Sequence, residues 1–314
     1  MPPPIIEVRD LVKRYRKAAA NAVDGISFEV APGEFFALLG PNGAGKTTTI
    51  AVLTTTLSPT SGTVRVAGHD VSREAAAVRR SVGIIFQKPS LDSNLTAEEN
   101  VRFHSVMYGL YPFRPAYRLM PEAYRRQVKE LAEILGIERD IFKPVRTLSG
   151  GMRRKLEIVR SLMHRPQVLF LDEPTSGLDA ASRRDLWEYL QKIRRESNTT
   201  ILLTTHQLEE AEGADSLCII NEGRVVRSGT PTRLTAEMTE MHLLLDTAAG
   251  GREALRLELG RLGLAVSDAR PFKVPLDGRS VQQVIQSIQT PLTLVRTLAP
   301  TLEEAYLAIV EKRP

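Results

Sequence analysis

The stretch LGPNGAGKTTT, residues 39–49, decides the fold of this chain. It comes directly after the apolar run EFFAL at residues 34–38, and residues 40–47 match the pattern G-x-x-x-x-G-K-[ST]. Glycines allow a backbone to approach a phosphate closely, and the N–H groups at the start of a helix bind anions. An accidental match is expected in about one chain of this length in a hundred. The sequence therefore predicts a phosphate-binding loop between a strand and a helix that begins near Lys46.

Each residue type in this loop suits the phosphates of a nucleotide. The Lys46 ammonium group would reach the β- and γ-phosphates, and the Thr47 hydroxyl would ligate Mg²⁺. The residues expected to hold the nucleotide here are Gly40, Pro41, Asn42, Gly43, Ala44, Gly45, Lys46, Thr47 and Thr48.

Two carboxylates end a second apolar run. VLFLDEP, residues 168–174, places Asp172 and Glu173 at the carboxyl end of a strand of the parallel type, the edge at which ligands of such sheets bind. Asp172 is suited to the Mg²⁺ shell, and Glu173 is suited to polarise an attacking water. Taken alone, the pair is equally consistent with a strand cap before Pro174. Together with the phosphate loop, it indicates a hydrolytic site.

Two further polar residues end β-rich runs in the same way. His206 closes TTILLTTH at residues 199–206, and Gln87 closes VGIIFQ at residues 82–87. A single histidine or glutamine is more often a packing or surface residue. Because the carboxyl ends of parallel strands meet at one sheet edge, we expect His206 near the γ-phosphate and Gln87 in contact with metal or water.

Composition and charge limit the class of protein. The chain has 314 residues, of which 42% are hydrophobic, and no apolar run long enough to cross a bilayer. The N-terminus lacks the pattern of a signal peptide, and the single cysteine, Cys218, excludes an intramolecular disulfide and fits a reducing cytosol. A net charge of +5 would suit nucleic acid, but the arginines are scattered through predicted helices, which favours ordinary solvated faces. We expect no nucleic-acid partner.

The order of apolar runs predicts two domains. Residues 1–232 alternate strand-like and helical patterns, which indicates an α/β sheet covered on both faces. Within them, residues 96–165 show helical spacing and no convincing strand, so we expect a helical insert at about residues 88–165. Residues 233–314 restart the alternation and predict a small α/β extension, for which packing is the default role.

The motif that points to a family is LSGGMRRK, residues 148–155. A Ser-Gly-Gly turn that opens a helix makes a second anion-binding N-terminus. With GPNGAGKTT, Gln87, VLFLDEP, SGLD at residues 176–179 and His206 in this order, residues 5–232 resemble the ATP-binding cassette family, the nucleotide-binding subunits of ABC transporters. This resemblance implies a P-loop NTPase (RecA-like) core sheet, with an antiparallel β-subdomain and a helical insert.

The resemblance also implies a dimer in which two cassettes, head to tail, sandwich two ATP molecules. The second cassette would be another copy of this chain or a related cassette. Ser149, Gly150 and Gly151 would cover the γ-phosphate held by the other subunit, and Asp179 would communicate across the interface.

Catalytic roles follow from the same resemblance. Glu173 would act as general base, His206 would clamp the γ-phosphate, and Lys46 and Gln87 would complete the catalytic set. Tyr15, just after the first strand, matches the aromatic residue that stacks on adenine, whereas on its own a tyrosine there is more often a packing residue.

One position departs from the family pattern, since Met152 replaces the usual fifth signature residue, glutamine. The serine and glycine contacts are unaffected, so we expect ATP to close the dimer all the same. This motif resembles cassettes of the ABC-2 export branch, such as daunorubicin-resistance-like subunits, and the final run at residues 300–310 resembles their terminal helix. An importer subunit with a C-terminal sensor domain and a non-transport ABC ATPase are the alternatives.

A cassette without a membrane span needs a separate permease, so we expect this protein at the cytoplasmic face of the membrane, attached through that partner. The proline-broken run at residues 109–121 is our candidate for the docking segment, because interface anchors are often aromatic or arginine. The anchors suggested there are Tyr111, Phe113, Arg114, Tyr117 and Arg118. A disordered surface loop is the alternative.

Overall fold

The computed structural model describes residues 2–87, 90–176, 178–238, 241–248, 250–267, 269–298 and 301–311. The chain divides into two compact units, Met1–Ser228 and Gly229–Pro314. The sequence placed this division between residues 232 and 233.

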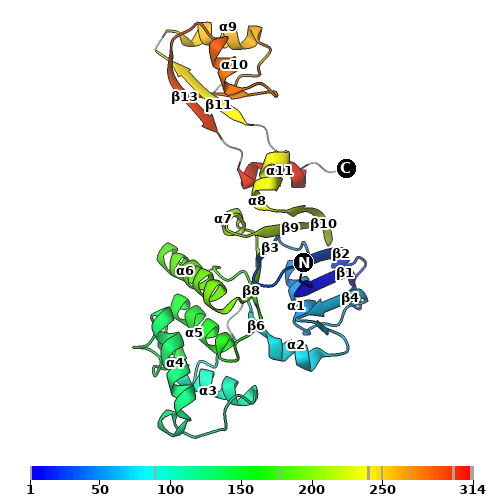
Figure 1. The fold of residues 1–314 in the computed structure, drawn as a ribbon, viewed down its shortest axis with the longest axis vertical. Coiled ribbons are helices and arrows are strands. Elements are labelled where there is room, and N and C mark those ends of the chain that lie inside the picture. The colour runs from blue at the N-terminus through cyan, green and yellow to red at the C-terminus, as the bar shows by residue number, and fades with distance from the viewer. Residues whose placement is uncertain are drawn as a thin grey trace. The chain divides into compact units, whose positions relative to one another are not determined.

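The first unit is built on a six-stranded sheet in the order β10-β9-β3-β8-β7-β6 (Figure 1). Its strands are β3 (Phe35–Leu39), β6 (Val82–Ile85), β7 (Val168–Asp172), β8 (Thr200–Thr205), β9 (Ser216–Asn221) and β10 (Arg224–Gly229). The pairs from β6 to β9 are parallel, and every residue of β3, β7 and β8 is buried. Strands buried on both faces are typical of parallel sheets covered by helices. The predicted α/β core is therefore confirmed.

Register brings the carboxyl ends of the central strands together. Leu39 lies opposite Thr205, and Asp172 lies opposite Thr204. The segments that follow β3, β7 and β8 therefore leave the sheet at the same edge. The helix α1 (Lys46–Leu53) starts there, and in Figure 1 it lies on the opposite side of the sheet from α6 (Ala180–Ser197).

A second, antiparallel sheet has the order β2-β1-β4-β5. It consists of β1 (Ile6–Lys13), β2 (Val23–Val30), β4 (Ser61–Val66) and β5 (His69–Asp70), and α2 (Ala75–Ser81) leads from it back to β6. Its inner face shares one apolar cluster with the first sheet, in which the rings of Phe28 and Phe36 stack with centroids 5.2 Å apart. This is the antiparallel subdomain that the resemblance implied.

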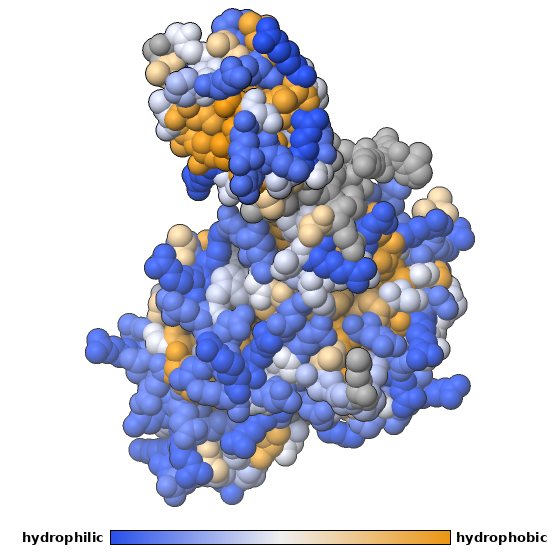
Figure 2. All heavy atoms as spheres, turned by 45° about the horizontal axis from the view of Figure 1, so that its top comes forward, coloured by the Kyte–Doolittle hydropathy of each residue, from blue (hydrophilic) through white to orange (hydrophobic). Residues whose placement is uncertain are grey.

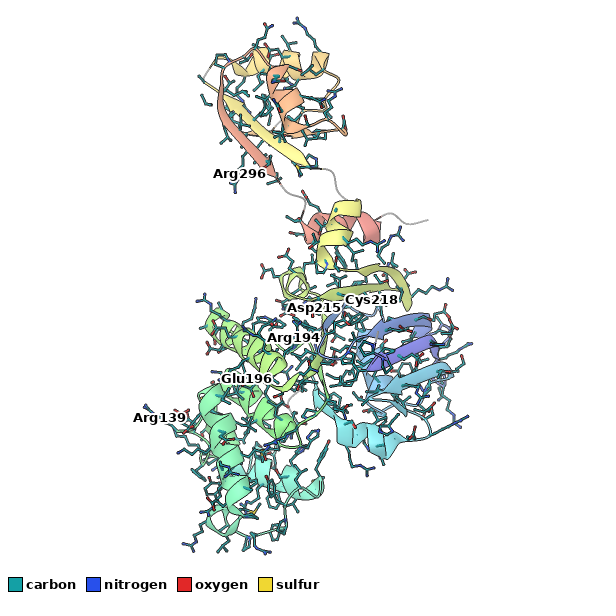
Figure 3. The ribbon with its side chains drawn as sticks, in the orientation of Figure 1. Arg139, Arg194, Glu196, Asp215, Cys218 and Arg296 are labelled. Atoms are coloured by element: carbon teal, nitrogen blue, oxygen red, sulfur yellow. The ribbon has the colours of Figure 1, made fainter. Side chains whose placement is uncertain are left out.

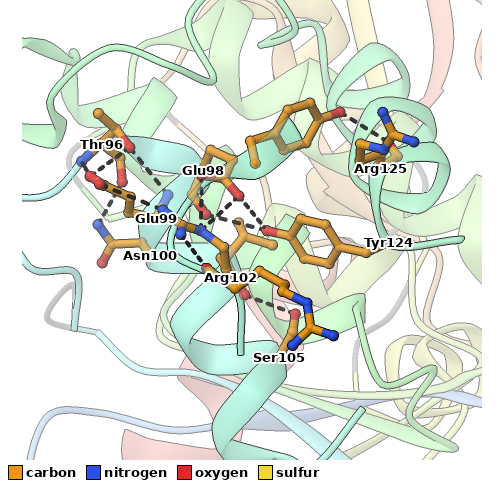
Figure 4. A network of polar contacts seen from close by, with 11 residues as sticks. Thr96, Glu98, Glu99, Asn100, Arg102, Ser105, Tyr124 and Arg125 are labelled. Carbon is orange, nitrogen blue, oxygen red and sulfur yellow. Dashed lines mark hydrogen bonds and ion pairs between the residues drawn. The ribbon is translucent and has the colours of Figure 1, made fainter. Parts of the chain in front are cut away.

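The helical insert contains α3 (Ala97–Met107), α4 (Glu122–Leu135) and α5 (Gly150–Leu162), with short 3-10 turns at η1 (Tyr117–Leu119) and η2 (Val145–Thr147). Its interior holds a buried ion pair, since Arg102 lies 3.1 Å from Glu98 and both are at most 3% exposed. Tyr124 of α4 donates a hydrogen bond of 2.9 Å to Glu98 Oε1 (Figure 4). The ion pair lies within α3, and the Tyr124 hydrogen bond joins it to α4.

Side chains of the insert also hold the run at residues 109–121. Arg102 donates a hydrogen bond of 2.7 Å to the Arg114 carbonyl. The hydroxyl of Tyr111 donates to Gln127 Oε1 at 2.9 Å, and that of Tyr117 donates to the Arg125 carbonyl at 3.3 Å. These two tyrosines are turned toward α4 and pack the segment onto the insert.

The second unit contains a three-stranded antiparallel sheet, in the order β12-β11-β13. Its elements are α8 (Pro231–Met238), β11 (His242–Thr247), α9 (Arg252–Arg261), β12 (Phe272–Pro275), α10 (Val281–Gln286), β13 (Leu292–Leu298) and α11 (Leu302–Glu311). Leu243 and Leu245 of β11 pack in a core of their own with Leu255 and Leu259 of α9. The expected terminal helix is α11, and it packs against α8.

The surface of the first unit is largely hydrophilic on the face shown in Figure 2, as expected for charged helices that face water. In the described part of the chain, no helix has both the length and the apolar character needed to cross a membrane.

Candidate active site

The phosphate loop lies between β3 and α1 and encloses the amine of Lys46. Gly43 and Gly45 have φ angles of 83° and 103°, and a Cβ on Gly45 would lie 2.5 Å from the Ala22 carbonyl oxygen, so a side chain does not fit there. The Lys46 amine donates hydrogen bonds of 2.7 and 3.0 Å to the carbonyls of Gly40 and Pro41. These contacts hold the Lys46 ammonium group beside the N-terminus of α1. The N–H groups of that terminus and the ammonium group would both attract an anion.

Burial lowers the pKa of Lys46, while the nearby carboxylates of Glu173 and Asp172 act in the opposite direction. The loop therefore places its lysine within the electrostatic reach of the two carboxylates that end β7.

Oxygen atoms converge on Asp172, which is 2% exposed at the end of β7. The Thr47 hydroxyl donates to Asp172 Oδ1 at 3.2 Å, and the Thr204 hydroxyl donates to the same oxygen at 2.5 Å. Hydroxyl and carboxylate oxygens are the ligands that Mg²⁺ prefers, usually together with substrate phosphates. The described residues hold no cluster of three or more His, Cys, Asp or Glu side chains that could bind a metal by themselves. This donor set therefore fits a metal that a bound phosphate helps to hold.

Glu173 lies at the centre of a second group. Its backbone has a φ of 45°, in the left-handed region that non-glycine residues occupy at a cost of about 1–3 kcal/mol. Gln87 Nε2 donates to Glu173 Oε2 at 2.8 Å, and His206 Nδ1 lies 3.1 Å from Glu173 Oε1. The residues after β6, β7 and β8 thus meet at one carboxylate.

Tyr15 stands beside the phosphate loop. Its hydroxyl is 3.2 Å from the Thr48 hydroxyl, and the residue is 44% exposed. The Lys13 amine lies over the Tyr15 ring, 5.9 Å from its centroid, and the exposed part of the ring could stack on a planar base.

The second set of expected ligands lies at the starts of α5 and α6. The Ser149 hydroxyl caps α5 and accepts a hydrogen bond of 3.2 Å from the Met152 N–H. Asp179 caps α6 and accepts hydrogen bonds of 2.9 Å from the N–H and from the hydroxyl of Ser182, which hold its pKa below the usual range. The cap of α5 is a neutral hydroxyl, so an anion can still approach the N-terminus of that helix, whereas the N-terminus of α6 already carries the Asp179 carboxylate.

The turn formed by Ser149, Gly150 and Gly151 is called the signature turn, and its two glycines differ in their surroundings. A Cβ on Gly151 would lie 2.8 Å from the Ser182 hydroxyl oxygen, whereas a Cβ on Gly150 would meet no described atom within 4 Å. In the part of the chain that the structure describes, no hydrogen bond joins this turn to the phosphate loop.

Two residues of the site were not identified from the sequence. Thr204 is polar in a fully buried strand, which is a weak signal that a hydroxyl is needed there. Arg154 follows the signature turn and is 6% exposed, with hydrogen bonds to main-chain carbonyls at the end of β7. In the sequence it is indistinguishable from a solvated arginine.

Comparisons with known proteins agree with this geometry. Residues 23–176 match the family model described as ABC transporter. The chain is 37% identical to the daunorubicin/doxorubicin resistance ATP-binding protein DrrA of Streptomyces peucetius, over 97% of this chain and 92% of that protein. It is 43% identical to the Nod factor export ATP-binding protein I of Ralstonia nicotianae, over 74% of this chain and 68% of that protein. The predicted likeness to the export branch is therefore confirmed.

A solved structure shares the fold. The dimeric post-hydrolysis state of the ATP-binding cassette MJ0796, bound to ADP and Pi, is 25% identical with a TM-score of 0.64, over 72% of this chain and 98% of that one. Together with the likeness to the two export proteins, this shows that the chain belongs to the ABC transporter family, as an ATP-binding subunit with ATPase activity.

Proposed function

We propose that two copies of this chain bind two molecules of Mg·ATP head to tail, hydrolyse them, and drive export through a separate permease at the cytoplasmic face of the membrane. The observation that carries this proposal is the Glu173 carboxylate, held by Gln87 and His206 beside the Lys46 amine. The names of the two relatives support export, and the transported molecule would be selected by the permease.

The phosphates of ATP would replace the internal hydrogen bonds of the loop. Lys46 would exchange the carbonyls of Gly40 and Pro41 for β- and γ-phosphate oxygens, while Tyr15 stacks on adenine. We assign Thr47, Asp172 and the amide oxygen of Gln87 to Mg²⁺, which would neutralise charge on the phosphates when bound.

The Glu173 carboxylate would accept the proton of the attacking water. Gln87 and His206 hold its two oxygens at separate positions, so the carboxylate is oriented before water arrives. His206 would in addition contact the γ-phosphate, as the family resemblance implies.

A second copy would complete each site. Ser149, Gly150 and Gly151 would close over the γ-phosphate bound by the partner, and Asp179 would lie at the same interface. The open space around Gly150 supports this assignment, because a phosphate could approach the helix N-terminus there.

The permease would dock on an exposed aromatic surface of the insert. Phe103 and Phe113 stack with ring centroids 6.1 Å apart and are 38% and 50% exposed, next to Met107 at 84%. We therefore assign docking to these three residues, with the exposed Arg114 alongside, and assign Tyr111 and Tyr117 to packing.

Glu173→Gln tests the catalytic part of this proposal. The change preserves size and removes the proton acceptor, so the turnover number for ATP should fall by about 10²–10⁴-fold while ATP still binds. Turnover like that of the unchanged protein would remove Glu173 from its role. Docking is tested separately, because Met107→Ser with Phe113→Ser should reduce co-purification with the permease, whereas Leu257→Ser, an exposed residue of the second unit, should not.

A further inference from the structure

Arg154 has an unusual position for an arginine on a helix of the insert. It lies one turn into α5, close behind the signature turn, and is 6% exposed. Its guanidinium group donates hydrogen bonds to four main-chain carbonyls, those of Phe86 at 2.5 Å, Pro174 at 2.9 Å, Asp172 at 3.3 Å and Glu173 at 3.4 Å. It also pairs with Glu157 at 3.1 Å.

These carbonyls flank the residues that would carry out the reaction. Phe86 directly precedes Gln87, and the other three carbonyls belong to the turn that carries Glu173. Because the Glu173 backbone is in the left-handed region, it keeps that conformation only if its surroundings hold it. The planar, rigid fork of a guanidinium group is suited to hold several acceptors at fixed angles.

The same helix also holds the chain after Gln87. Glu157 Oε1 accepts a hydrogen bond of 2.8 Å from the Ser90 N–H, and Arg160 donates one of 2.7 Å to the Ser90 carbonyl. Side chains of α5 therefore bind the main chain before Gln87, at Phe86, and after it, at Ser90. The same helix begins at the signature turn, so it connects that turn to the segment that carries Gln87.

We propose that Arg154 is a positioning residue that couples the signature turn of each copy to Gln87 and Glu173 of that same copy. This inference rests on the proposed function, in which the signature turn contacts ATP bound by the partner. ATP at one site would orient α5, and Arg154 would pass that orientation to the general base of the other site. The two sites of the dimer would then hydrolyse ATP cooperatively.

Arg154→Lys, in the full chain with its permease, tests this coupling. Lysine keeps the charge and loses the fork, so Gln87 and Glu173 become less well positioned. A misplacement of about 1 Å costs about 100-fold in rate, so we expect a 10- to 100-fold lower turnover number. The ATP affinity should change less than twofold, and the Hill coefficient should fall from above 1 to 1.

Arg194→Lys is the matched control. Arg194 donates a hydrogen bond of 2.9 Å to the Gly33 carbonyl and pairs with Asp215 at 2.6 Å; Figure 3 labels Arg194 and Asp215. Gly33 comes just before the start of β3, whereas the phosphate loop follows the end of that strand. The Arg194 side chain is 23% exposed, so this change removes the fork of a partly buried arginine far from the site. It should leave the turnover number and the Hill coefficient unchanged.

If Arg154→Lys does not fold, Glu157→Gln tests the same link, because it removes the carboxylate that orients the guanidinium group. It should lower the Hill coefficient with a smaller loss of turnover. A Hill coefficient that stays above 1 in the variant that folds would overturn the inference. Equal losses of turnover in Arg154→Lys and Arg194→Lys would also overturn it. An unchanged protein that hydrolyses ATP as a monomer would instead contradict the proposed function.

Discussion

His104 should make the stability of the first unit depend on pH. Its ring lies on α3, with centroids 4.3 Å from Tyr108 and 6.2 Å from His164, and its Nε2 has no hydrogen-bond partner among the described residues. Burial, with smaller contributions from Arg160 and His164, lowers the pKa of His104 to about 3. In the unfolded chain the pKa of the same group is about 6.5.

The sign follows from linkage. Because the pKa of His104 is depressed in the folded protein, the unfolded chain binds the proton first as the pH falls. The contribution of neutral His104 to the free energy of unfolding is therefore fully present above about pH 6.5 and is lost as the pH falls toward about 3. At pH 5 the loss from this one group is about 2 kcal/mol, since one pH unit corresponds to 1.4 kcal/mol once the unfolded histidine is charged. That is a large fraction of a typical stability of about 5–15 kcal/mol.

Urea unfolding at pH 7 and pH 5 measures this effect by fluorescence. Trp187 is the single tryptophan and lies on α6, so its emission reports the first unit. His104→Phe keeps an aromatic ring against Tyr108 and carries no proton. Between pH 7 and pH 5 the free energy of unfolding should fall about 2 kcal/mol more for the unchanged protein than for the variant. Equal losses in the two proteins would refute the reasoning.

Three further outcomes follow from the site and the core. Lys46→Ala should weaken ATP binding at least about tenfold and abolish hydrolysis, because it removes the charged group that would contact the phosphates; unchanged binding in a calorimetric titration would contradict the phosphate-loop assignment. Thr204→Val should raise the Mg²⁺ concentration needed for half-maximal hydrolysis several-fold, because Asp172 loses its 2.5 Å hydrogen bond; an identical Mg²⁺ titration would show that this contact is dispensable. Cys218 is fully buried in β9 (Figure 3), and burial raises the pKa of its thiol to about 12, so a thiol reagent should react with it only in urea; prompt labelling in buffer would contradict the described packing.

Much of the site could be predicted because strand ends are readable in a sequence. Apolar runs that stop at a polar residue located Gln87, Asp172 and His206 at the ends of β6, β7 and β8, and the edge rule for parallel sheets brought them together. The same reasoning placed the phosphate loop, since its pattern needs a strand before it and a helix after it.

Other features have no local signal in the sequence. Arg154 reads as a solvated charge, because the four carbonyls that it contacts come from chain segments far from α5. The left-handed backbone at Glu173 has no marker, since glutamate occupies that region only when its surroundings impose it. Tyr111 and Tyr117 read as exposed anchors until α4 supplies acceptors for their hydroxyls.

The mass of the ATP-bound protein tests most directly whether two copies of the chain share each ATP site. Glu173→Gln, saturated with Mg·ATP in an analytical ultracentrifuge, should sediment as a dimer with two nucleotides. Glu173→Gln combined with Gly150→Gln should bind one ATP per chain and remain a monomer, because the new side chain enters open space without disturbing its own chain and blocks the partner's γ-phosphate. A dimer of equal stability in both proteins, or a monomer in both, would contradict the claim that each copy completes the other's site.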